Sequence, residues 1–370
     1  MVPAPRLVDL VNERLEEFLS GRASILRSIA PDLDPLSEFS KRFLSGGKRF
    51  RAQFCVRGWE AVRGTAGEPA DIAATAERAA VVSASAALEV FHAAALVHDD
   101  LIDNSDTRRG APSAHRVFEA QHAESAWAGS APEYGRAAAV LLGDLLLGWS
   151  DELLDDGLAG LPAGPAARSA RLEFNRMRTE VTVGQYLDIL EERAWIAMPD
   201  DAQRARAERV VVFKSAKYSI EAPLVIGGAI AGASAAELDA LRAFGLPLGI
   251  AFQLRDDLLG VYGDPALTGK PAGDDLREGK RTVLIAIARE RLASPQRRLL
   301  DELLGDPELD DDQVRVLQQT LRECGAVDEV ERLIAMHTED GTRALESAAI
   351  DRDASAALAS LAEAVTRRAS

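Results

Sequence analysis

Pairs of neighbouring aspartates are the residues of this sequence best suited to chemistry. The first pair, Asp99 and Asp100, lies in HDDLID at 98–103. In the same motif Asp103 stands four residues after Asp99. On a helix this spacing brings both carboxylates to one face, with Cβ atoms roughly 5–6 Å apart, where they repel unless a cation lies between them. Mg²⁺ prefers oxygen ligands and is commonly held by one or two carboxylates together with substrate phosphates. The spacing therefore indicates a magnesium site for a phosphorylated substrate.

Two further acidic pairs follow later in the chain. DD at 256–257 comes after the apolar stretch 246–254, and DD at 274–275 stands in the next predicted loop. The first pair likewise follows a nearly apolar stretch, 79–97. We expect buried helices whose acidic ends open into a cavity, although solvated acidic helix ends are the plainer alternative. Two such clusters that face each other would hold several Mg²⁺ ions and bind a diphosphate by bridging its oxygens.

Positive charge is locally dense although the chain is acidic. GGKRFR at 46–51 joins two glycines, which let the backbone approach an anion closely, to three cationic residues. RRG at 108–110 lies just beyond the first acidic pair, and lysines stand at 214, 217, 270 and 280. Arginine matches phosphate oxygens with two parallel hydrogen bonds. Each group alone would be ordinary surface charge, but together with the acidic clusters they predict a separate cationic pocket for a second diphosphate.

The composition excludes several classes of protein. The 370 residues carry a net charge of −16, which would repel nucleic acid and anionic lipid, and a hydrophobic fraction of 47%, which excludes disorder. Two cysteines are too few for a disulfide framework. The N-terminus lacks a signal pattern, and the longest apolar run, 137–149, is too short to span a bilayer. We expect a cytoplasmic protein that binds no nucleic acid and is not inserted in a membrane.

Helices must position these groups. Ala, Leu, Arg and Glu are abundant, aromatic residues make up 5%, and alternation with period two is almost absent. The sequence predicts one all-α domain over residues 1–370. The predicted helices cover 5–29, 35–63, 71–103, 135–158, 167–194, 203–232, 235–263, 280–292, 296–304, 311–324, 326–348 and 353–368.

The motifs and their order resemble those of the trans-isoprenyl diphosphate synthases, the polyprenyl synthetase family, and in particular its bacterial geranylgeranyl diphosphate synthases. The resemblance runs from about residue 7 to at least 287. Any one motif is weak evidence, whereas the ordered set is highly specific. The motifs are GGKRFR at 46–51, DDLID at 99–103, RRG at 108–110, GQYLD at 184–188, KSAKYS at 214–219, FQLRDD at 252–257, and GK at 269–270 and 279–280.

The resemblance implies the isoprenoid synthase fold, a large single-domain helical bundle around a central active-site cavity, and a set of metal ligands. Asp99 and Asp103 would ligate Mg²⁺ bridged to an allylic diphosphate, with Asp100 in support. Asp256 would ligate a further ion on the opposite wall, with Asp257 and Asp275 reaching it through water. The implied cofactor is Mg²⁺, about three ions per site. The implied metal residues are Asp99, Asp100, Asp103, Asp188, Asp256 and Asp257.

The resemblance also implies which residues contact the two substrates. Those implied for the allylic diphosphate are Arg108, Lys214 and Lys270, and Lys280 also binds substrate. Those implied for the isopentenyl diphosphate pocket are Lys48, Arg51, His92 and Arg109. Those implied to line the reacting centre are Gln185, Asp188, Ser215, Tyr218 and Gln253, and the catalytic set is Lys214, Ser215, Tyr218 and Gln253.

The implied reaction condenses isopentenyl diphosphate with dimethylallyl, geranyl or farnesyl diphosphate, and the implied assembly is a homodimer. Mg²⁺ and cations neutralise the leaving diphosphate, and a dry apolar cavity surrounds the allylic cation. The departing diphosphate takes the final proton, so no catalytic His or Ser is needed. One position departs from the family: a third acid often stands four residues after the first Asp of the second motif, where this chain has Gly260.

The product is predicted from the helix that carries the first acidic pair. In this family the growing chain runs beside that helix, and Ala94 and Ala95 leave its path open. Phe91 lies one turn deeper, and Leu88 a further turn down. One turn spans about 5.4 Å, close to one prenyl unit. A floor at Phe91 predicts geranylgeranyl diphosphate, with twenty carbons.

Several alternatives stay open at this point. A farnesyl or longer polyprenyl diphosphate synthase would differ only in its product. A class I terpene cyclase would share the acidic clusters but would not need the isopentenyl pocket. A non-catalytic subunit of the same fold would be expected to lose acidic residues that this chain keeps. An HD-type metal phosphohydrolase would use His92 and His98-Asp99 as metal ligands, but leaves GGKRFR, KSAKYS and FQLRDD unexplained.

Overall fold

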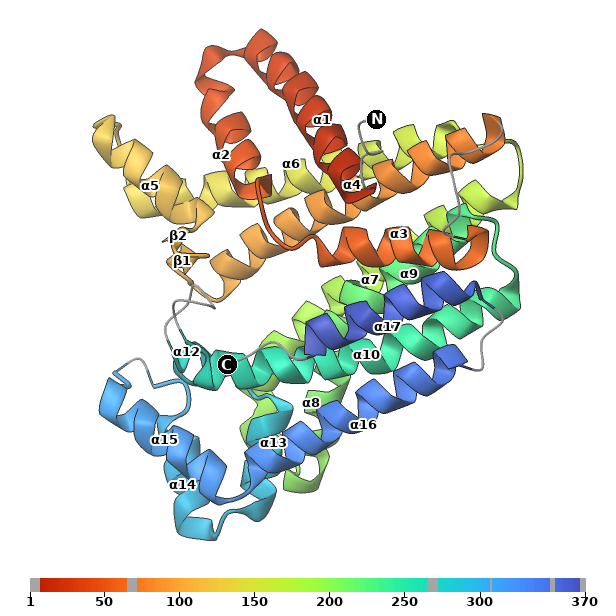
Figure 1. Cartoon of the computed structure of the whole chain (residues 1–370). Coiled ribbons are helices and arrows are strands. Elements are labelled where there is room, and N and C mark those ends of the chain that lie inside the picture. Colours follow the sequence, from red (N-terminus) through yellow and green to blue (C-terminus); the bar gives the residue numbers. More distant parts are fainter. Residues whose placement is uncertain (1–6, 65–71, 265–271, 307, 347–349, 367–370) are drawn as a thin grey trace. The chain divides into compact units, whose positions relative to one another are not determined.

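The chain is almost entirely helical, as the sequence predicts (Figure 1). The computed structural model describes residues 7–64, 72–264, 272–306, 308–346 and 350–366. Contacts divide the chain into two compact units. The N-terminal unit comprises Met1–Arg171 and Pro223–Ala233, and the C-terminal unit comprises Leu172–Ala222 and Ser234–Ser370. The predicted single domain over the whole chain stays a prediction.

Helix α4 (Ile72–Ile102) is the central element of the N-terminal unit (Figure 1). It packs along α6 (Ala131–Ala159) and also contacts α1 (Leu7–Ile29) and α3 (Phe50–Arg63). The other elements of this unit are η1 (Pro31–Leu33), α2 (Asp34–Leu44), the two-residue strands β1 (Thr107–Arg108) and β2 (Ala111–Pro112), α5 (Ala114–Glu124) and α9 (Ala222–Ile230).

Small residues allow the close packing of α4 against α6. A Cβ on Gly157 would stand 2.6 Å from the Cβ of Ser83, and Ser150 Oγ donates a 2.8 Å hydrogen bond to the Ala87 carbonyl. The segment Thr75–Ile102 of α4 is long and apolar enough to cross a membrane, so the prediction that no run reaches this length was wrong. However, 83% of its most apolar window is buried inside the protein, as expected of a core helix.

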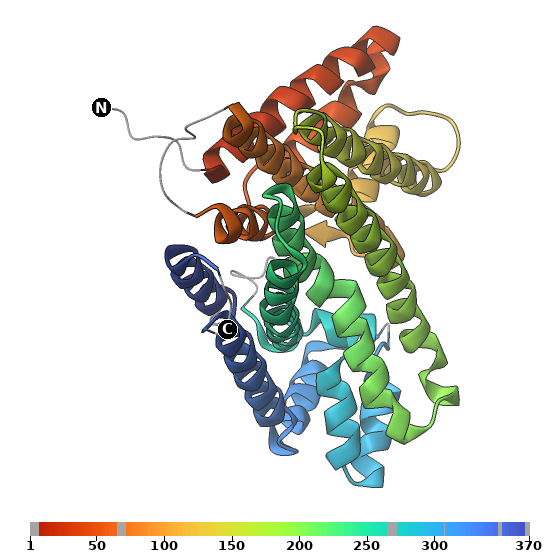
Figure 2. The same ribbon diagram turned by 90° about the vertical axis from the view of Figure 1, so that its right-hand side faces the viewer.

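Helix α10 (Ala235–Tyr262) is the corresponding centre of the C-terminal unit (Figure 2). It contacts a π-helix, η4 (Val211–Glu221), and the helices α16 (Ala326–Glu346) and α17 (Arg352–Thr366). Its first turn is fixed by a capping box between Ser234 and Glu237. The other elements are α7 (Pro165–Ala194), which begins in the N-terminal unit, η2 (Trp195–Ala197), η3 (Asp200–Ala202), α8 (Gln203–Val210), α12 (Asp274–Glu278), α13 (Val283–Arg291), α14 (Ser294–Leu303) and α15 (Asp311–Glu323).

The structure differs from the predicted helices in several places. The single helix predicted over 35–63 is interrupted between α2 and α3, because Gly46 and Gly47 adopt φ of 72° and 89°, in the left-handed region that glycine tolerates. Helices α5 and α12 were not predicted, and Asp274 and Asp275, which were expected in a loop, lie in the first turn of α12. The helix predicted over 203–232 has π geometry in its middle, where the hydrogen bonds span one residue more than in an α-helix.

Candidate active site

The first acidic motif lies at the C-terminal end of α4. Asp103 follows the last helical residue, yet its N–H still donates a 2.9 Å hydrogen bond to the Asp99 carbonyl, so the four-residue spacing keeps its helical geometry. Asn104 then turns the chain away with φ of 53°. Carboxylates at this end oppose the helix dipole, each at a cost of about 0.3–1 kcal/mol. The placement disfavours folding and suits a site that binds cations.

Arg108 and Asp100 form the main ion pair of this motif. The Asp100 carboxylate is 1% exposed and accepts two hydrogen bonds from Arg108, one of them 2.8 Å from Nε. Arg108 Nη2 also lies 3.5 Å from Asp99 Oδ2. Asp100, predicted as a metal residue, therefore holds Arg108 at the acidic end of α4. Its role toward a metal stays a prediction.

The next arginine contacts a different element. Strands β1 and β2 are joined by the two-residue turn Arg109-Gly110, and both residues have positive φ, 54° and 73°, which defines a type I′ turn. The Arg109 guanidinium lies over the loop between α2 and α3, where a Cβ on Gly47 would stand 3.6 Å from Nη1. The hairpin thus directs Arg108 to the acidic motif and Arg109 to GGKRFR.

A cationic cluster surrounds His92. Burial lowers the pKa of His92 well below its usual range, so the imidazole is neutral at pH 7. Nearby positive charges lower that pKa further. They come from Arg51, Arg109, Arg108 and Arg49. The structure therefore brings together three of the four residues predicted for the isopentenyl pocket, in surroundings that favour an anion.

Lys48 and Arg49 have different environments within GGKRFR. The Lys48 ammonium lies 5.9 Å from the centre of the Phe50 ring. Arg49, to which the sequence assigned no role, forms a buried ion pair with Glu89 at 3.3 Å and donates to Asn12 at 3.2 Å. Glu89 also accepts from the N–H of Ala52 in the first turn of α3. Arg49 therefore fixes the loop. Nothing in the sequence distinguishes this structural role from the substrate-binding roles predicted for Lys48 and Arg51.

The second acidic motif lies near the end of α10. The Asp257 side chain is buried and accepts a 2.7 Å hydrogen bond from Gln253 Nε2, one turn earlier. Burial raises the pKa of Asp257 well above its usual range, and the charges of Asp275, Asp256 and Asp188 raise it further. Four carboxylates of the C-terminal unit thus interact around one buried position.

Two lysines contact Asp188 of α7. Lys214 Nζ donates a hydrogen bond to Asp188 Oδ2, and Lys280 Nζ lies 3.4 Å from the same oxygen. Lys280 also donates to Glu192, one turn further along α7, at 3.0 Å. In this structure Asp188 is therefore the acceptor of two ammonium groups, and its predicted contact with a metal stays a prediction.

The π-helix packs against both neighbours through glycine. A Cβ on Gly184 of α7 would stand 2.7 Å from the Cα of Lys214, and a Cβ on Gly249 of α10 would stand 2.7 Å from the Cα of Ala216. Real Cβ atoms essentially never approach so closely. The two glycines therefore allow η4 to lie directly on α7 and α10, which places Lys214 beside Asp188.

The remaining predicted residues of the reacting centre are largely buried. Ser215 and Tyr218 lie in η4 and are buried. Gln185 stands one residue after Gly184, and its buried Nε2 has no hydrogen-bond partner among the described residues. A buried amide donor without a protein acceptor is uncommon and suits a bound ligand oxygen. Lys270 lies outside the described residues.

The donor chemistry of both motifs suits Mg²⁺. Within the described ranges, no three or more His, Cys, Asp or Glu side chains are grouped so that they could hold a metal on their own. Pairs of carboxylates occur instead, on α4 and on α10. Mg²⁺ is typically held in this way, by few carboxylates, several waters and substrate phosphates.

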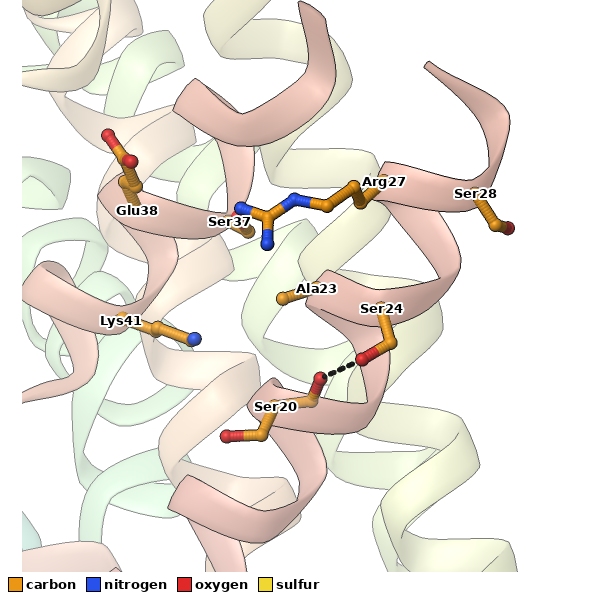
Figure 3. A pocket seen from close by; sticks show the side chains of 8 residues that line it. All are labelled: Ser20, Ala23, Ser24, Arg27, Ser28, Ser37, Glu38 and Lys41. Carbon is orange, nitrogen blue, oxygen red and sulfur yellow. Dashed lines mark hydrogen bonds between the residues drawn. The ribbon is translucent and has the colours of Figure 1, made fainter. Parts of the chain in front are cut away.

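Two other features do not belong to this chemistry. His98 points to α6, with Nε2 3.5 Å from Asp144 Oδ1 and the ring against Gly143, which argues against its use as a metal ligand beside Asp99. A hollow of about 510 Å³ between α1 and α2 is lined mainly by serines and by charged side chains such as Arg27 and Lys41 (Figure 3). None of the predicted site residues lines it.

Most of the chain is similar in sequence and fold to known proteins. The model of a family described as polyprenyl synthetase matches residues 34–321. A crystal structure of geranylgeranyl pyrophosphate synthase from Corynebacterium glutamicum, complexed with isoprenyl diphosphate and magnesium, is 38% identical and superposes with a TM-score of 0.89. That match covers 98% of this chain and 99% of the other.

Curated relatives are similar over most of their length. Geranylgeranyl diphosphate synthase from Sulfolobus acidocaldarius is 30% identical over 81% of this chain and 78% of its own. Geranylfarnesyl diphosphate synthase from Aeropyrum pernix is 31% identical over 84% of this chain and 86% of its own. The proteins similar to this chain therefore include synthases of more than one product length.

Proposed function

Because this chain belongs to the polyprenyl synthetase family and is a prenyltransferase, we propose that it condenses isopentenyl diphosphate with an allylic diphosphate to form geranylgeranyl diphosphate. The observation that carries this proposal is the hairpin that directs Arg108 to the acidic motif and Arg109 to GGKRFR. Such an enzyme must distinguish two diphosphates. One is bound through metal ions and the other through cationic side chains.

In the N-terminal unit, Asp99 and Asp103 would hold Mg²⁺ on the allylic diphosphate, and Asp100 would hold Arg108 beside it. Lys48, Arg51, Arg109 and neutral His92 would bind the diphosphate of isopentenyl diphosphate. Bound Mg²⁺ neutralises charge on the leaving diphosphate. Arg108 would add to this neutralisation, because it lies at the same acidic end of α4.

In the C-terminal unit, Asp256 would hold a further Mg²⁺ for an allylic diphosphate, and Asp257 would support it. Lys214 would exchange its contact with Asp188 for a diphosphate oxygen, with Lys280 and Lys270 as further cations. Gln185, Ser215, Tyr218 and Gln253 would surround the allylic carbon with oriented dipoles.

The proposed step breaks the bond between the allylic carbon and the diphosphate oxygen. The double bond of isopentenyl diphosphate then attacks that carbon and forms the new C–C bond. A proton leaves the adjacent carbon of the isopentenyl unit and passes to the departing diphosphate. The protein supplies binding, charge and the exclusion of water, and needs no protein nucleophile.

The proposed product length depends on α4. Ala94, Phe91 and Leu88 are all buried, and a chain that grows along α4 from Asp99 would pass Ala95 and Ala94 before it reached Phe91. This order supports four prenyl units. One relative is named geranylfarnesyl diphosphate synthase. A longer product is therefore the first alternative to geranylgeranyl diphosphate.

We also propose a cytoplasmic homodimer with about three Mg²⁺ ions per site. The support for a second copy is an apolar stripe of exposed side chains on α7, where Leu172, Val183 and Tyr186 recur at helical spacing. Exposed apolar stripes commonly mark interfaces. Equilibrium sedimentation that shows only monomer would contradict this assembly.

The function is tested with purified protein, radiolabelled isopentenyl diphosphate, Mg²⁺ and each of dimethylallyl, geranyl and farnesyl diphosphate. We expect labelled twenty-carbon alcohol after phosphatase treatment, and loss of labelling with EDTA. A hydrocarbon formed from an allylic diphosphate alone would indicate a terpene cyclase. Full activity in EDTA would contradict the proposal.

A further inference from the structure

The guanidinium of Arg281 is buried against an aromatic ring. Its Cζ lies over the Trp195 ring, 3.7 Å from the ring centre, and the side chain is 9% exposed. The buried Nε has no hydrogen-bond acceptor among the described residues. Arginine stacks well on aromatic rings because its guanidinium is planar and weakly hydrated. The Trp195 ring is therefore a principal contact of this side chain.

One carboxylate balances the charges of Arg281 and of a second arginine. Asp301 accepts a 3.1 Å hydrogen bond from Arg281 Nη1 and a 2.8 Å hydrogen bond from Arg289 Nε. Burial lowers the pKa of Arg281 to about 10, which leaves the side chain charged at pH 7. A buried charge is costly to remove from water, so the burial of Arg281 calls for a reason.

Trp195 shares one helix face with the two carboxylates that contact Lys280. Asp188, Glu192 and Trp195 follow one another at intervals of four and three residues, which places them along one face at the end of α7 and the start of η2. Lys280 contacts the two carboxylates, and the next residue, Arg281, contacts the ring. Two consecutive side chains therefore contact the same face.

The segment that carries Lys280 has no helical structure of its own. Residues 280–282 connect α12 to α13, and the N–H of Lys280 donates a 3.0 Å hydrogen bond to the Asp275 carbonyl. That bond fixes the segment on the side of α12, and the Arg281 side chain links it to the end of α7. Lysine has a flexible four-carbon stem, so the position of its ammonium depends on how firmly this backbone is held.

We propose that Arg281 is a positioning residue for Lys280. Its stack on Trp195 fixes residues 280–282 against α7 and so holds the Lys280 ammonium beside Asp188, where it would meet a diphosphate. Arg281 itself would not contact the substrate. The inference rests on the proposed function, in which Lys280 is one of the cations for the allylic diphosphate.

The test compares variants of the stack with a variant of the lysine. Arg281→Ala removes the guanidinium, Trp195→Leu removes the aromatic face, and Trp195→Phe retains an aromatic face. Lys280→Ala and the double variant Lys280→Ala/Arg281→Ala measure the coupling. The control is Arg297→Ala, which removes another arginine of the same ion-pair network, one that donates to Asp200 at 3.1 Å.

Affinity is measured as the Kd of geranyl diphosphate with Mg²⁺ by isothermal titration calorimetry. Isopentenyl diphosphate is left out, so that no condensation takes place. The KM of each substrate and kcat are measured alongside, and thermal unfolding verifies folding. A purely structural defect would lower the number of binding sites in the titration and leave their Kd unchanged, whereas a misplaced ammonium raises the Kd itself.

We expect Lys280→Ala to weaken binding of geranyl diphosphate by roughly 10-fold or more, as for a lost hydrogen bond to a charged group. Arg281→Ala and Trp195→Leu should weaken it by about 3–10-fold, because the ammonium is retained but less well placed. Trp195→Phe should keep most of the affinity. The KM for isopentenyl diphosphate should not change in these variants, and Arg297→Ala should bind like the unmodified chain.

The double variant should bind no worse than Lys280→Ala, because residues that act through one group are not additive. Fold-changes that multiply would overturn the coupling, and an unchanged Kd in folded Arg281→Ala would overturn the positioning role. If Arg281→Ala does not fold, Arg281→Lys takes its place, since it keeps the charge and loses the planar group.

Failure of the proposed function would give a different result. The unmodified chain would then form no prenyl diphosphate and would bind no geranyl diphosphate. An unmodified chain that binds and condenses both substrates, together with Arg281 variants of unchanged Kd, would overturn only the role of Arg281.

Discussion

Gly184 lies so close to the backbone of Lys214 that only glycine fits at position 184. A Cβ there would stand 2.7 Å from the Lys214 Cα. Gly184→Ala must therefore displace η4 from α7 and move Lys214 away from Asp188. We expect a loss of about 1–3 kcal/mol in the free energy of unfolding, as for other overpacked sites, and a fall in kcat.

The matched control is Gly148→Ala on α6. Gly148 is exposed, and nothing lies within 4 Å of a Cβ at that position. Replacement there should stabilise the chain slightly, by up to about 1 kcal/mol, because alanine favours helix. Urea unfolding and steady-state kinetics on both variants measure the difference. Equal behaviour of the two variants would contradict the close packing of η4.

Metal dependence should follow the two acidic motifs. Asp99→Ala and Asp256→Ala should each lower turnover by at least roughly 100–1000-fold, because charge on the leaving diphosphate is no longer neutralised. Circular dichroism should remain unchanged. Asp144→Ala, which removes an exposed carboxylate that faces His98, is the control. Wild-type turnover in either motif variant would contradict the metal assignment.

Neighbouring arginines should affect different substrates. Arg108→Ala should raise the KM for the allylic diphosphate, and Arg51→Ala or Lys48→Ala should raise the KM for isopentenyl diphosphate, each by about 10-fold or more, as for lost hydrogen bonds to charged groups. Asp100→Asn should resemble Arg108→Ala, because it releases the Arg108 side chain. Equal effects of all variants on both substrates would argue against two pockets.

His92 should make stability depend on pH. The pKa of His92 is lowered below its usual value of 6.5 in the folded state. At a pH between these two pKa values, the unfolded chain therefore binds a proton that the folded chain does not. The contribution of neutral His92 to the free energy of unfolding is complete above pH 6.5. It is lost as the pH falls, at up to about 1.4 kcal/mol per pH unit. Denaturant unfolding at pH 7.5 and 5.5 should show a larger loss for the wild type than for His92→Gln. The reverse order would contradict the buried neutral state.

Product length should respond to two positions on α4. Ala94→Phe should shorten the product to about fifteen carbons, and Phe91→Ala should lengthen it past twenty, because one helical turn of about 5.4 Å corresponds to one prenyl unit. Chromatography of dephosphorylated products measures both effects. An unchanged product distribution in Phe91→Ala would show that Phe91 is not the floor of the pocket.

Residue spacing was sufficient to predict what lies within one helix. Asp99 and Asp103 keep their helical relationship, and α4 and α10 occupy almost the predicted residues, because apolar periodicity and spacing of three or four residues are local properties. The helical fold class follows from the same patterns. The two carboxylate pairs therefore could be found without any knowledge of tertiary structure.

Contacts between elements could not be predicted in this way. The stack of Arg281 on Trp195, the ion pair of Arg49 with Glu89, and the two lysines on Asp188 depend on which helices pack together. Helix α5 was missed because charged and polar residues hide its period. The break between α2 and α3 could have been predicted, since GG at 46–47 is a local signal for a turn.

The type I′ turn at Arg109-Gly110 has a geometric consequence for the two basic contacts. Arg108 and Arg109 are joined by one peptide unit, so their Cα atoms are held about 3.8 Å apart by covalent bonds and not by packing. The hairpin therefore holds the two backbone positions at a fixed spacing, from which the two side chains reach different elements. A single residue inserted into the turn would alter this spacing while leaving both arginines in place in the sequence.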